Sequence, residues 1–395
     1  MKIYYSINDP YPAYRVDLTE LFGVELQRLG VETKWFMDAP LKKGVPPNEF
    51  FGQQVVVPEG GAGLLRKGRY WFFDISRIAS LKRSDVDAIQ CRDKYIGALA
   101  GLLKARALGI PFFYWCSYPF PEHKLALAEK ATGGRKLLSL AQGWLGYWIL
   151  YKIVMPNSTH VFVQSEQMKR DLTRIGVDPS KMTPVLMGVA SGMLDWARRN
   201  EVSVEPEKVV YLGTFASVRR LGTVIRAFSQ VVKNIPKAKL FMVGDGDVPE
   251  ERAELERLAK ELDISESVVF TGFVPMEQAW LHAKSAAVCL SPFYPTPILA
   301  SASPTKLVEY MALGRPIICN DHPEQSSVIQ DSGAGICVQW NEKDFADAIT
   351  WVLQNRGEAE RRANFGPDWV QNNRVYKKIA EQVYEIYKSK IKVGG

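Results

Sequence analysis

Short apolar runs alternate with helix-period stretches along nearly the whole chain, and this alternation restricts the fold more than any other feature. Residues 209–213 (VVYLG) and 239–243 (KLFMV) each read as a buried strand, and each is followed by a helical pattern, at 221–234 and 250–262. Strands that are apolar throughout are typical of parallel sheets covered on both faces by helices. The pattern predicts an α/β fold with a doubly wound sheet.

The same alternation is found in both halves of the chain. A chain of 395 residues exceeds the size at which one hydrophobic core stops growing. We therefore expect two doubly wound Rossmann-like domains that face each other across a cleft. The expected strands are 2–6, 33–37, 87–91, 111–115 and 160–165 in the first half and 209–213, 239–243, 268–270, 286–292 and 316–319 in the second.

The polar segment 200–208 (NEVSVEPEK) predicts the linker between the domains. The N-terminal domain is then 1–199 and the C-terminal domain 200–370. Tyrosine and isoleucine recur at helical spacing in the last segment, 371–395, which predicts a long amphipathic helix.

The net charge of +7 indicates an anionic partner, and charge alone does not choose among a phosphate-bearing substrate, an acidic membrane surface and nucleic acid. The five cysteines are scattered without paired C-x-x-C spacing, which argues against a zinc cluster or a disulfide scaffold. Free thiols fit a reducing compartment. The first ten residues lack the apolar run of a signal peptide, so we expect a cytoplasmic protein.

Glycines follow three successive predicted strands of the second half, at Gly213, Gly244 and Gly272. In open parallel sheets, ligands bind at the carboxyl ends of the strands, where glycine lets the main chain approach them. Arg219 lies near the start of the next helix, and an arginine fork suits phosphate oxygens. These positions predict a phosphate-binding edge.

The segment 303–316 (SPTKLVEYMALGRP) predicts a helix with Ser303 as its N-cap and Pro304 as its first residue. Its free N–H groups and the Lys306 ammonium would receive a pyrophosphate. Glu309 lies near the same end, because a helix has ~3.6 residues per turn, and its carboxylate suits two ribose hydroxyls.

These residues resemble the nucleotide-binding domain of the family-four retaining glycosyltransferases (glycosyl transferases group 1), which have the GT-B fold. The family hallmark is a Glu, seven residues and a second Glu, followed by Ala-Met-Ala-x-Gly-x-Pro. Glu309 matches the second Glu and YMALGRP follows it, whereas Ser301 stands where the family has the first. In the family the first Glu contacts the donor sugar and the second holds the ribose, so the resemblance supports nucleotide binding better than any sugar. The arginine and lysine of the family's phosphate segment correspond to Thr214 and Arg219.

The resemblance implies that the helix in 371–395 crosses back onto the N-terminal domain. It also implies a retaining hexosyltransferase that uses a UDP-sugar or GDP-sugar and needs no cofactor. In its front-face mechanism the departing diphosphate accepts the acceptor's proton. No metal site is expected, because Asp245 and Asp247 lie in a glycine turn. The predicted catalytic residues are Arg219, Lys306 and Glu309, and the predicted nucleotide-sugar site adds Gly213, Thr214, Gly244, Gly272, Phe273, Ser301, Ser303, Pro304, Thr305 and Leu307.

Loops after the first-domain strands are expected to bind the acceptor. They supply the candidates Tyr11, Arg15, Arg92, Trp115, Ser117 and Glu122.

Residues 135–155 hold 15 uncharged residues, 137–151, between basic flanks. A spanning helix needs ~20 apolar residues, so the segment predicts either an interfacial helix on an anionic membrane or a buried helix of the first domain. In the first case the enzyme would elongate a lipid-linked saccharide in surface polysaccharide synthesis at the inner face of the cell membrane. No nucleic-acid partner is expected.

Two alternatives stay open: a nucleotide-sugar epimerase of related fold, and a non-catalytic nucleotide-sugar-binding subunit.

Overall fold

The computed structural model describes residues 1–11, 13, 15–38, 53–56 and 63–391. The chain forms two compact units, Met1–Leu186 with Tyr376–Gly395, and Met187–Val375. The boundary predicted at residue 199 is therefore wrong, because the chain divides after Leu186. The predicted linker is also misplaced, since a strand of the second unit begins at Glu205. Its apolar residues, 209–211, are buried in a parallel sheet, which outweighs the polar character of the residues before them.

The first unit contains a parallel seven-stranded sheet in the order β3-β2-β1-β4-β5-β6-β7. Its strands are β1 (Lys2–Pro10), β2 (Glu32–Asp38), β3 (Gln53–Val56), β4 (Ala88–Arg92), β5 (Phe112–Cys116), β6 (His160–Val163) and β7 (Met182–Pro184). Its helices are η1 (Asp17–Glu25), α1 (Leu26–Arg28), α2 (Gly63–Ser80), α3 (Ile96–Leu108), α4 (Phe120–Lys130), α5 (Gly133–Tyr147), η2 (Trp148–Val154), α6 (Met155–Asn157), α7 (Glu166–Arg174), η3 (Pro179–Lys181) and α18 (Tyr376–Ile391).

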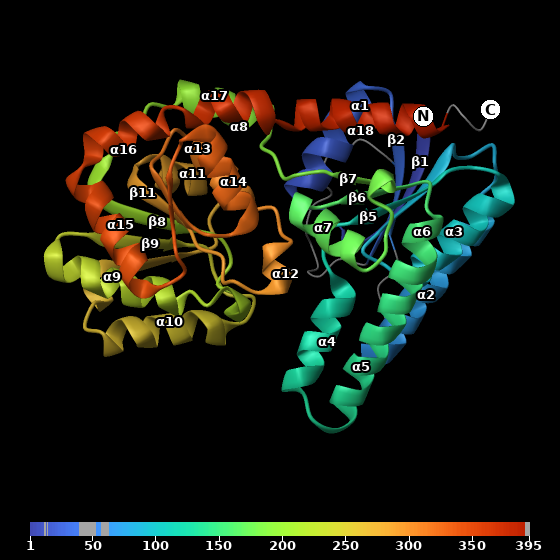
Figure 1. Cartoon of the computed structure of the whole chain (residues 1–395), viewed down its shortest axis with the longest axis horizontal. Coiled ribbons are helices and arrows are strands. Elements are labelled where there is room, and N and C mark those ends of the chain that lie inside the picture. Colours follow the sequence, from blue (N-terminus) through green and yellow to red (C-terminus); the bar gives the residue numbers. More distant parts are fainter. Residues whose placement is uncertain (12, 14, 39–52, 57–62, 392–395) are drawn as a thin grey trace. The chain divides into compact units, whose positions relative to one another are not determined.

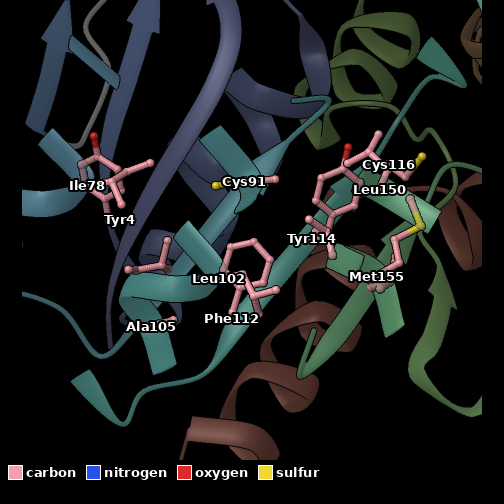
Figure 2. Close-up of a cluster of buried hydrophobic side chains, with 14 of the residues drawn as sticks. Tyr4, Ile78, Cys91, Leu102, Ala105, Phe112, Tyr114, Cys116, Leu150 and Met155 are labelled. Carbon is pink, nitrogen blue, oxygen red and sulfur yellow. The ribbon is translucent and has the colours of Figure 1, made fainter. Parts of the chain in front are cut away.

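Both faces of this sheet are buried, as the apolar strands predict. On one face, Figure 2 shows Tyr4, Phe112 and Tyr114 of the strands beside Leu102 of α3 and Leu150 of η2. The opposite face packs against η1 and α18.

Helix α18 belongs to the first unit although it lies at the far end of the sequence. Tyr376, Val383 and Tyr387 are buried in the same core as the residues of η1. The Tyr387 hydroxyl donates a 2.6 Å hydrogen bond to Oε1 of Gln90 on β4. The helix therefore completes one face of the first sheet.

The second unit contains a parallel six-stranded sheet in the order β10-β9-β8-β11-β12-β13. Its strands are β8 (Glu205–Leu212), β9 (Lys239–Val243), β10 (Val268–Gly272), β11 (Ala286–Ser291), β12 (Ile317–Asn320) and β13 (Ile336–Val338). Its helices are α8 (Ser191–Arg199), η4 (Ser217–Arg219), α9 (Gly222–Asn234), α10 (Pro249–Glu261), η5 (Ser265–Ser267), α11 (Met276–Lys284), α12 (Pro297–Ala300), α13 (Thr305–Ala312), α14 (Pro323–Ser332), α15 (Glu342–Gln354), α16 (Arg356–Ala363) and α17 (Gly366–Asn373).

The chain order of the second sheet reverses between β8 and β11. From β8 the sheet continues through β9 and β10 in one direction and through β11, β12 and β13 in the other. Helices α9, α10 and α15 cover one face, and α8, α11 and α13 cover the other (Figure 1). Such a reversal opens a crevice at the carboxyl ends of the two central strands, so this edge is where a ligand is expected.

The predicted fold class, two doubly wound α/β units, is confirmed by both sheets. All ten predicted strands exist with ends shifted by a few residues. The strands β3, β7 and β13 were not predicted, because each has only three or four residues and too few apolar positions to show a period. In the part of the chain that the structure describes, no helix is long and apolar enough to cross a membrane.

Candidate functional site

The ends of β8 and β9 are held together by main-chain hydrogen bonds. The N–H of Gly213 donates to Val243 O at 2.9 Å, and the N–H of Phe215 donates to Asp245 O at 2.8 Å. Gly244 has a φ of 132°, and a Cβ added there would lie 2.2 Å from the carbonyl oxygen of Gly213. Only glycine fits this approach, so the close packing of the two strand ends requires glycine at position 244. We call the main chain at Gly213, Gly244 and Gly272 the glycine edge.

Helix α13 begins at Thr305, with Pro304 in extended conformation before it. The prediction that Ser303 caps this helix is wrong. Its hydroxyl accepts a 2.8 Å hydrogen bond from the N–H of Met187 and donates one of 2.6 Å to Glu324. The residue before the helix is Pro304, and no side chain of the described residues caps the first turn of α13. The N–H groups of that turn therefore remain available to an anion.

Lys306 lies in the first turn of α13 with 7% of its surface exposed. Its Nζ has no hydrogen-bond partner among the described residues and lies 4.0 Å from the ring centroid of Tyr211. A Cβ on Gly213 would lie 3.1 Å from this Nζ, so the ammonium faces the glycine edge. Burial, together with the nearby charge of Arg219, places the pKa of Lys306 well below its ordinary value. A buried cation without a partner is costly unless an anion joins it.

Glu309 lies one turn further along α13 and is partly buried. Burial raises the pKa of its carboxyl to about 7, although the charge of Lys306 opposes the shift. The carboxyl has no hydrogen-bond partner among the described residues. It is therefore available to hydroxyl donors of a ligand.

Arg219 ends the short helix η4 and is half-buried beside the same edge. Its Nε donates a 3.2 Å hydrogen bond to Oγ1 of Thr214, and the Tyr211 hydroxyl donates one of 3.0 Å to the carbonyl oxygen of Thr214. Tyr211 thus organises both cations, since its hydroxyl holds the loop that orients Arg219 and its ring lies against Lys306. Its position inside an apolar strand gave no signal of this role.

The loop between β11 and α13 is held by Asn320 at the end of β12. The N–H of Phe293 donates to Oδ1 of Asn320 at 2.7 Å, and Nδ2 of Asn320 donates to the carbonyl oxygen of Phe293 at 2.9 Å. The Phe293 ring centroid lies 5.8 Å from the Nζ of Lys306. Asn320 was not predicted, because only the packed sheet brings it to this loop.

The remaining predicted donor residues have different surroundings. Ser301 is buried, and its hydroxyl donates a 3.3 Å hydrogen bond to Pro297 O. Leu307 is part of the core, so its side chain cannot contact a ligand. Phe273, directly after Gly272, is 70% exposed.

Two acceptor candidates on the first unit are enclosed in its interior. Trp115 packs in the core with its ring centroid 5.0 Å from that of Phe162, because its side chain points from β5 toward the face of the sheet that η1 and α18 cover. Arg92 is 0% exposed and donates a 2.6 Å hydrogen bond to Asp17. Burial alone would raise the pKa of Asp17, but Arg92 lowers it to about 2. Both side chains are thus structural, and expecting them to bind a ligand directly was wrong.

The other acceptor candidates are more accessible. Tyr11 and Arg15 are partly buried, and Arg15 pairs with Asp17 at 3.2 Å. Ser117 is buried, with 9% of its surface exposed, and accepts a 3.3 Å hydrogen bond from Arg92. Glu122 accepts a 2.8 Å hydrogen bond from the Tyr151 hydroxyl, and burial raises the pKa of Glu122.

A second candidate site is the outward face of α5 and η2. Apolar side chains project from it into solvent, including Trp144 with 52% and Trp148 with 60% of the surface exposed. The inward face carries Gly143, where a Cβ would lie 2.7 Å from a side-chain carbon of Leu125 on α4. Small residues thus bring α4 and α5 close together, as the hairpin in Figure 1 shows, and the large apolar residues remain outside. We call these the α5 stripe: Leu137, Leu138, Trp144, Leu145 and Trp148.

The α5 stripe is flanked by exposed basic residues, Arg135 and Lys136 at one end and Lys152 at the other. No acidic residue occurs between residues 133 and 154. The alternative in which this segment is a buried helix fails for the stripe, because its two tryptophans are exposed.

We expect Lys306→Met to stabilise the second unit by about 1–3 kcal/mol, because it removes a buried polar group that has no hydrogen-bond partner where the structure is described. The unfolded chain holds the Lys306 proton more tightly than the folded chain does, so the gain should shrink as pH rises toward the ordinary lysine pKa. Hydrogen exchange of peptides from β8 to β12 measures the change. Lys208→Met is the matched control, because Lys208 is equally buried but bonded to Glu205 and Ser285, and it should be destabilising. A loss of stability in both variants would contradict the cost assigned to Lys306.

Known proteins resemble both units in sequence. The family model described as Glycosyl transferases group 1 matches residues 194–369, and the model described as Glycosyltransferase Family 4 matches residues 19–191. Alpha-monoglucosyldiacylglycerol synthase of Streptococcus pneumoniae is 31% identical over 34% of this chain and 29% of its own length. Phosphatidyl-myo-inositol mannosyltransferase of Mycobacterium tuberculosis is 26% identical over 49% of this chain and 50% of its own length. The matches thus span about half or less of these two relatives.

Solved structures resemble the fold over almost the whole chain. Sucrose-phosphate synthase from Thermosynechococcus elongatus is 16% identical, with a TM-score of 0.73 over 98% of this chain and 99% of that one. HepE from Anabaena, solved in complex with UDP-glucose, is 13% identical, with a TM-score of 0.67 over 98% of this chain and 100% of that one. These likenesses show the GT-B fold. Because the two family models together match nearly all of both units, the chain belongs to the family-four, group 1 glycosyltransferases of GT-B fold.

Proposed function

We propose that this protein is a retaining hexosyltransferase whose second unit binds a UDP-sugar or GDP-sugar. The observation that carries the proposal is the buried ammonium of Lys306, which has no hydrogen-bond partner in the described part of the chain and faces the main chain of Gly213 at the reversal point of the sheet. A pyrophosphate supplies the negative charge that this position lacks. The structure of HepE with UDP-glucose, a protein of the same fold, supports a nucleotide-sugar donor.

In this proposal each group of the edge has a separate role. The pyrophosphate lies against the free N–H groups of α13, with Lys306 and Arg219 beside it, and these donors stabilise the charge that develops as the glycosidic bond breaks. The Glu309 carboxylate accepts hydrogen bonds from the two ribose hydroxyls. The exposed Phe273 and the main chain at Gly272 contact the base.

The two cations give the departing diphosphate its positive partners without requiring a metal ion or another cofactor. A diphosphate oxygen then accepts the proton of the acceptor hydroxyl on the same face of the sugar. Asp245 and Asp247 have structural roles in this scheme. Asp245 accepts a 2.9 Å hydrogen bond from the N–H of Gly246, and the N–H of Asp247 donates one of 2.9 Å to Glu251.

For the acceptor we propose a lipid-linked saccharide at a membrane surface that the α5 stripe contacts. The stripe presents apolar side chains between basic ends, which is the pattern of a helix lying in an anionic membrane interface. The names of the two relatives, a glucosyldiacylglycerol synthase and a phosphatidyl-inositol mannosyltransferase, refer to lipids and support this class of acceptor. Of the predicted acceptor residues, Tyr11, Arg15, Ser117 and Glu122 remain candidates.

Thermal stabilisation by a panel of UDP-, GDP- and ADP-sugars tests the donor proposal, because a ligand that binds only the folded state raises the midpoint temperature of unfolding. We expect a UDP-sugar or a GDP-sugar to give the largest shift. Lys306→Met should weaken the binding of that donor by about ten- to a hundredfold, since it removes a charged hydrogen bond to phosphate. Binding that survives in Lys306→Met would exclude this lysine as the phosphate partner.

Product analysis with the same donor separates the alternatives. Transfer to a glycolipid acceptor with retained anomeric configuration supports the proposal, a changed sugar on the nucleotide indicates an epimerase, and binding without turnover indicates a non-catalytic subunit. The last alternative is favoured by one feature, the hydroxyl of Ser301 where the family has a carboxylate.

Donor affinity should depend on pH through Glu309. Its pKa of about 7 means that roughly 10% of the carboxyl is ionised one unit lower. If the ribose binds the ionised form, affinity for a UDP-sugar rises by about tenfold from pH 6 to pH 8. Calorimetry across this range measures the rise in affinity. Glu309→Gln should bind the UDP-sugar more weakly, and its affinity should not rise with pH. The same pH dependence in Glu309→Gln would assign it to another group.

Vesicle binding tests the α5 stripe. We expect the protein to sediment with vesicles that contain phosphatidylglycerol, and less so at high salt, because the basic flanks attract anionic headgroups. The double variant Trp144→Ser, Trp148→Ser should bind at least about tenfold more weakly, since it removes two interfacial aromatic anchors. Phe365→Ser is the control, because Phe365 is also 60% exposed but lies on the second unit. Equal vesicle binding by the double variant and the wild type would rule out the stripe as the contact.

A further inference from the structure

Two cysteines lie directly opposite each other on neighbouring strands of the second sheet. Cys319 of β12 is paired with Cys337 of β13 in the parallel register, and both thiols are free. Residues paired in register point their side chains to the same face of a sheet, so the two thiols lie beside each other. Paired positions on adjacent strands are roughly 5 Å apart, which lies within the Cα separation of disulfides.

The two thiols differ in accessibility and in acidity. Cys337 is exposed, whereas Cys319 is buried. The hydrogen bond from Cys319 lowers the pKa of Cys337, and the hydroxyl of Ser326, 3.4 Å from its Sγ, adds to the effect. The same hydrogen bond and burial raise the pKa of Cys319. The exposed member of the pair is thus the nucleophilic one, and the buried member lies beside it.

We infer that Cys319 and Cys337 form a redox modification site, in which a peroxide converts the two thiols into a reversible disulfide. The Cys337 thiolate attacks one peroxide oxygen, the O–O bond breaks, and Cys337 becomes a sulfenic acid as the other oxygen leaves as hydroxide. The Cys319 sulfur then attacks the Cys337 sulfur, the S–O bond breaks, and the Cys319 proton leaves with that oxygen as water. One peroxide is reduced and two thiols are oxidised.

The cysteine pair lies near the loop between β11 and α13, which precedes the helix of the proposed donor site. Asn320, directly after Cys319, holds the main chain of Phe293 by two hydrogen bonds from its side-chain amide. Trp340, two residues after β13, contacts Tyr294 with ring centroids 5.6 Å apart. A disulfide joins the two sulfurs at about 2.05 Å and fixes the ends of β12 and β13, which contact Phe293 and Tyr294 through Asn320 and Trp340. We therefore expect oxidation to weaken donor binding. This consequence rests on the proposed function, whereas formation of the disulfide does not.

Peptide mapping after treatment with hydrogen peroxide tests the modification. Cleavage after Glu324 separates the two cysteines, so a disulfide appears as a linked pair of peptides that dithiothreitol releases. Cys337→Ser should form no linked pair. Cys319→Ala should stop at a Cys337 sulfenic acid that dimedone traps. Cys289→Ala is the control, because Cys289 is a buried thiol of the same unit outside the pair, and it should still form the linked peptides.

Three results would overturn the inference: a Cys337 oxidised to sulfinic acid while Cys319 stays free, a disulfide between two chains through Cys337, or no reaction at either thiol. A second measurement addresses regulation. The affinity for a UDP-sugar should fall by about two- to tenfold in the oxidised protein and recover with dithiothreitol. Unchanged affinity in fully oxidised protein would reject the regulatory role. Absence of UDP-sugar binding in the reduced protein as well would count against the proposed donor, and the peptide map would still decide the disulfide.

Discussion

The second unit is organised around the buried ammonium of Lys306. The side chain reaches back from α13 to the end of β8, where the Tyr211 ring covers it and the main chain of Gly213 faces it. A side chain on Gly213 would crowd the ammonium, and one on Gly244 would collide with Gly213. The glycine edge, the tyrosine ring and the start of α13 are therefore parts of one arrangement. Its common feature is an ammonium to which the described residues offer no hydrogen-bond acceptor.

This arrangement depends on the reversal of strand order. Because β9 and β11 lie on opposite sides of β8, the chain segments that follow β8 and β11 separate at this edge instead of covering it. Arg219 comes from the segment after β8, and Lys306 and Glu309 come from the helix after β11. Two cations and a carboxyl with a raised pKa thus converge from distant parts of the sequence on one accessible edge. Such a set suits a ligand that carries both phosphates and hydroxyls.

The first unit is also an α/β unit, but its buried charge and its exposed surface differ from those of the second unit. Its sheet buries Arg92 in an ion pair with Asp17, so that charge has an acidic partner within the fold. Its unsatisfied surface is apolar instead, and the α5 stripe leaves tryptophans in solvent beside basic residues. In the second unit the described residues give the Lys306 ammonium no hydrogen-bond partner, and in the first unit the apolar α5 stripe is exposed to solvent. The proposed donor and membrane surface supply these two missing partners.

The sequence by itself determined the two sheets, the glycine edge and the cations at its rim, because apolar runs, strand-ending glycines and a helix start are local patterns. It also marked residues 135–155 as apolar between basic flanks, without deciding which side faces solvent. Only the tertiary structure decided that Ser303 bonds Glu324 instead of capping α13, that Trp115 and Arg92 are interior, and that Tyr211 and Asn320 support the site. The reason is physical: whether a polar side chain is satisfied or free depends on partners that come from other elements, and those partners are adjacent only in the folded chain.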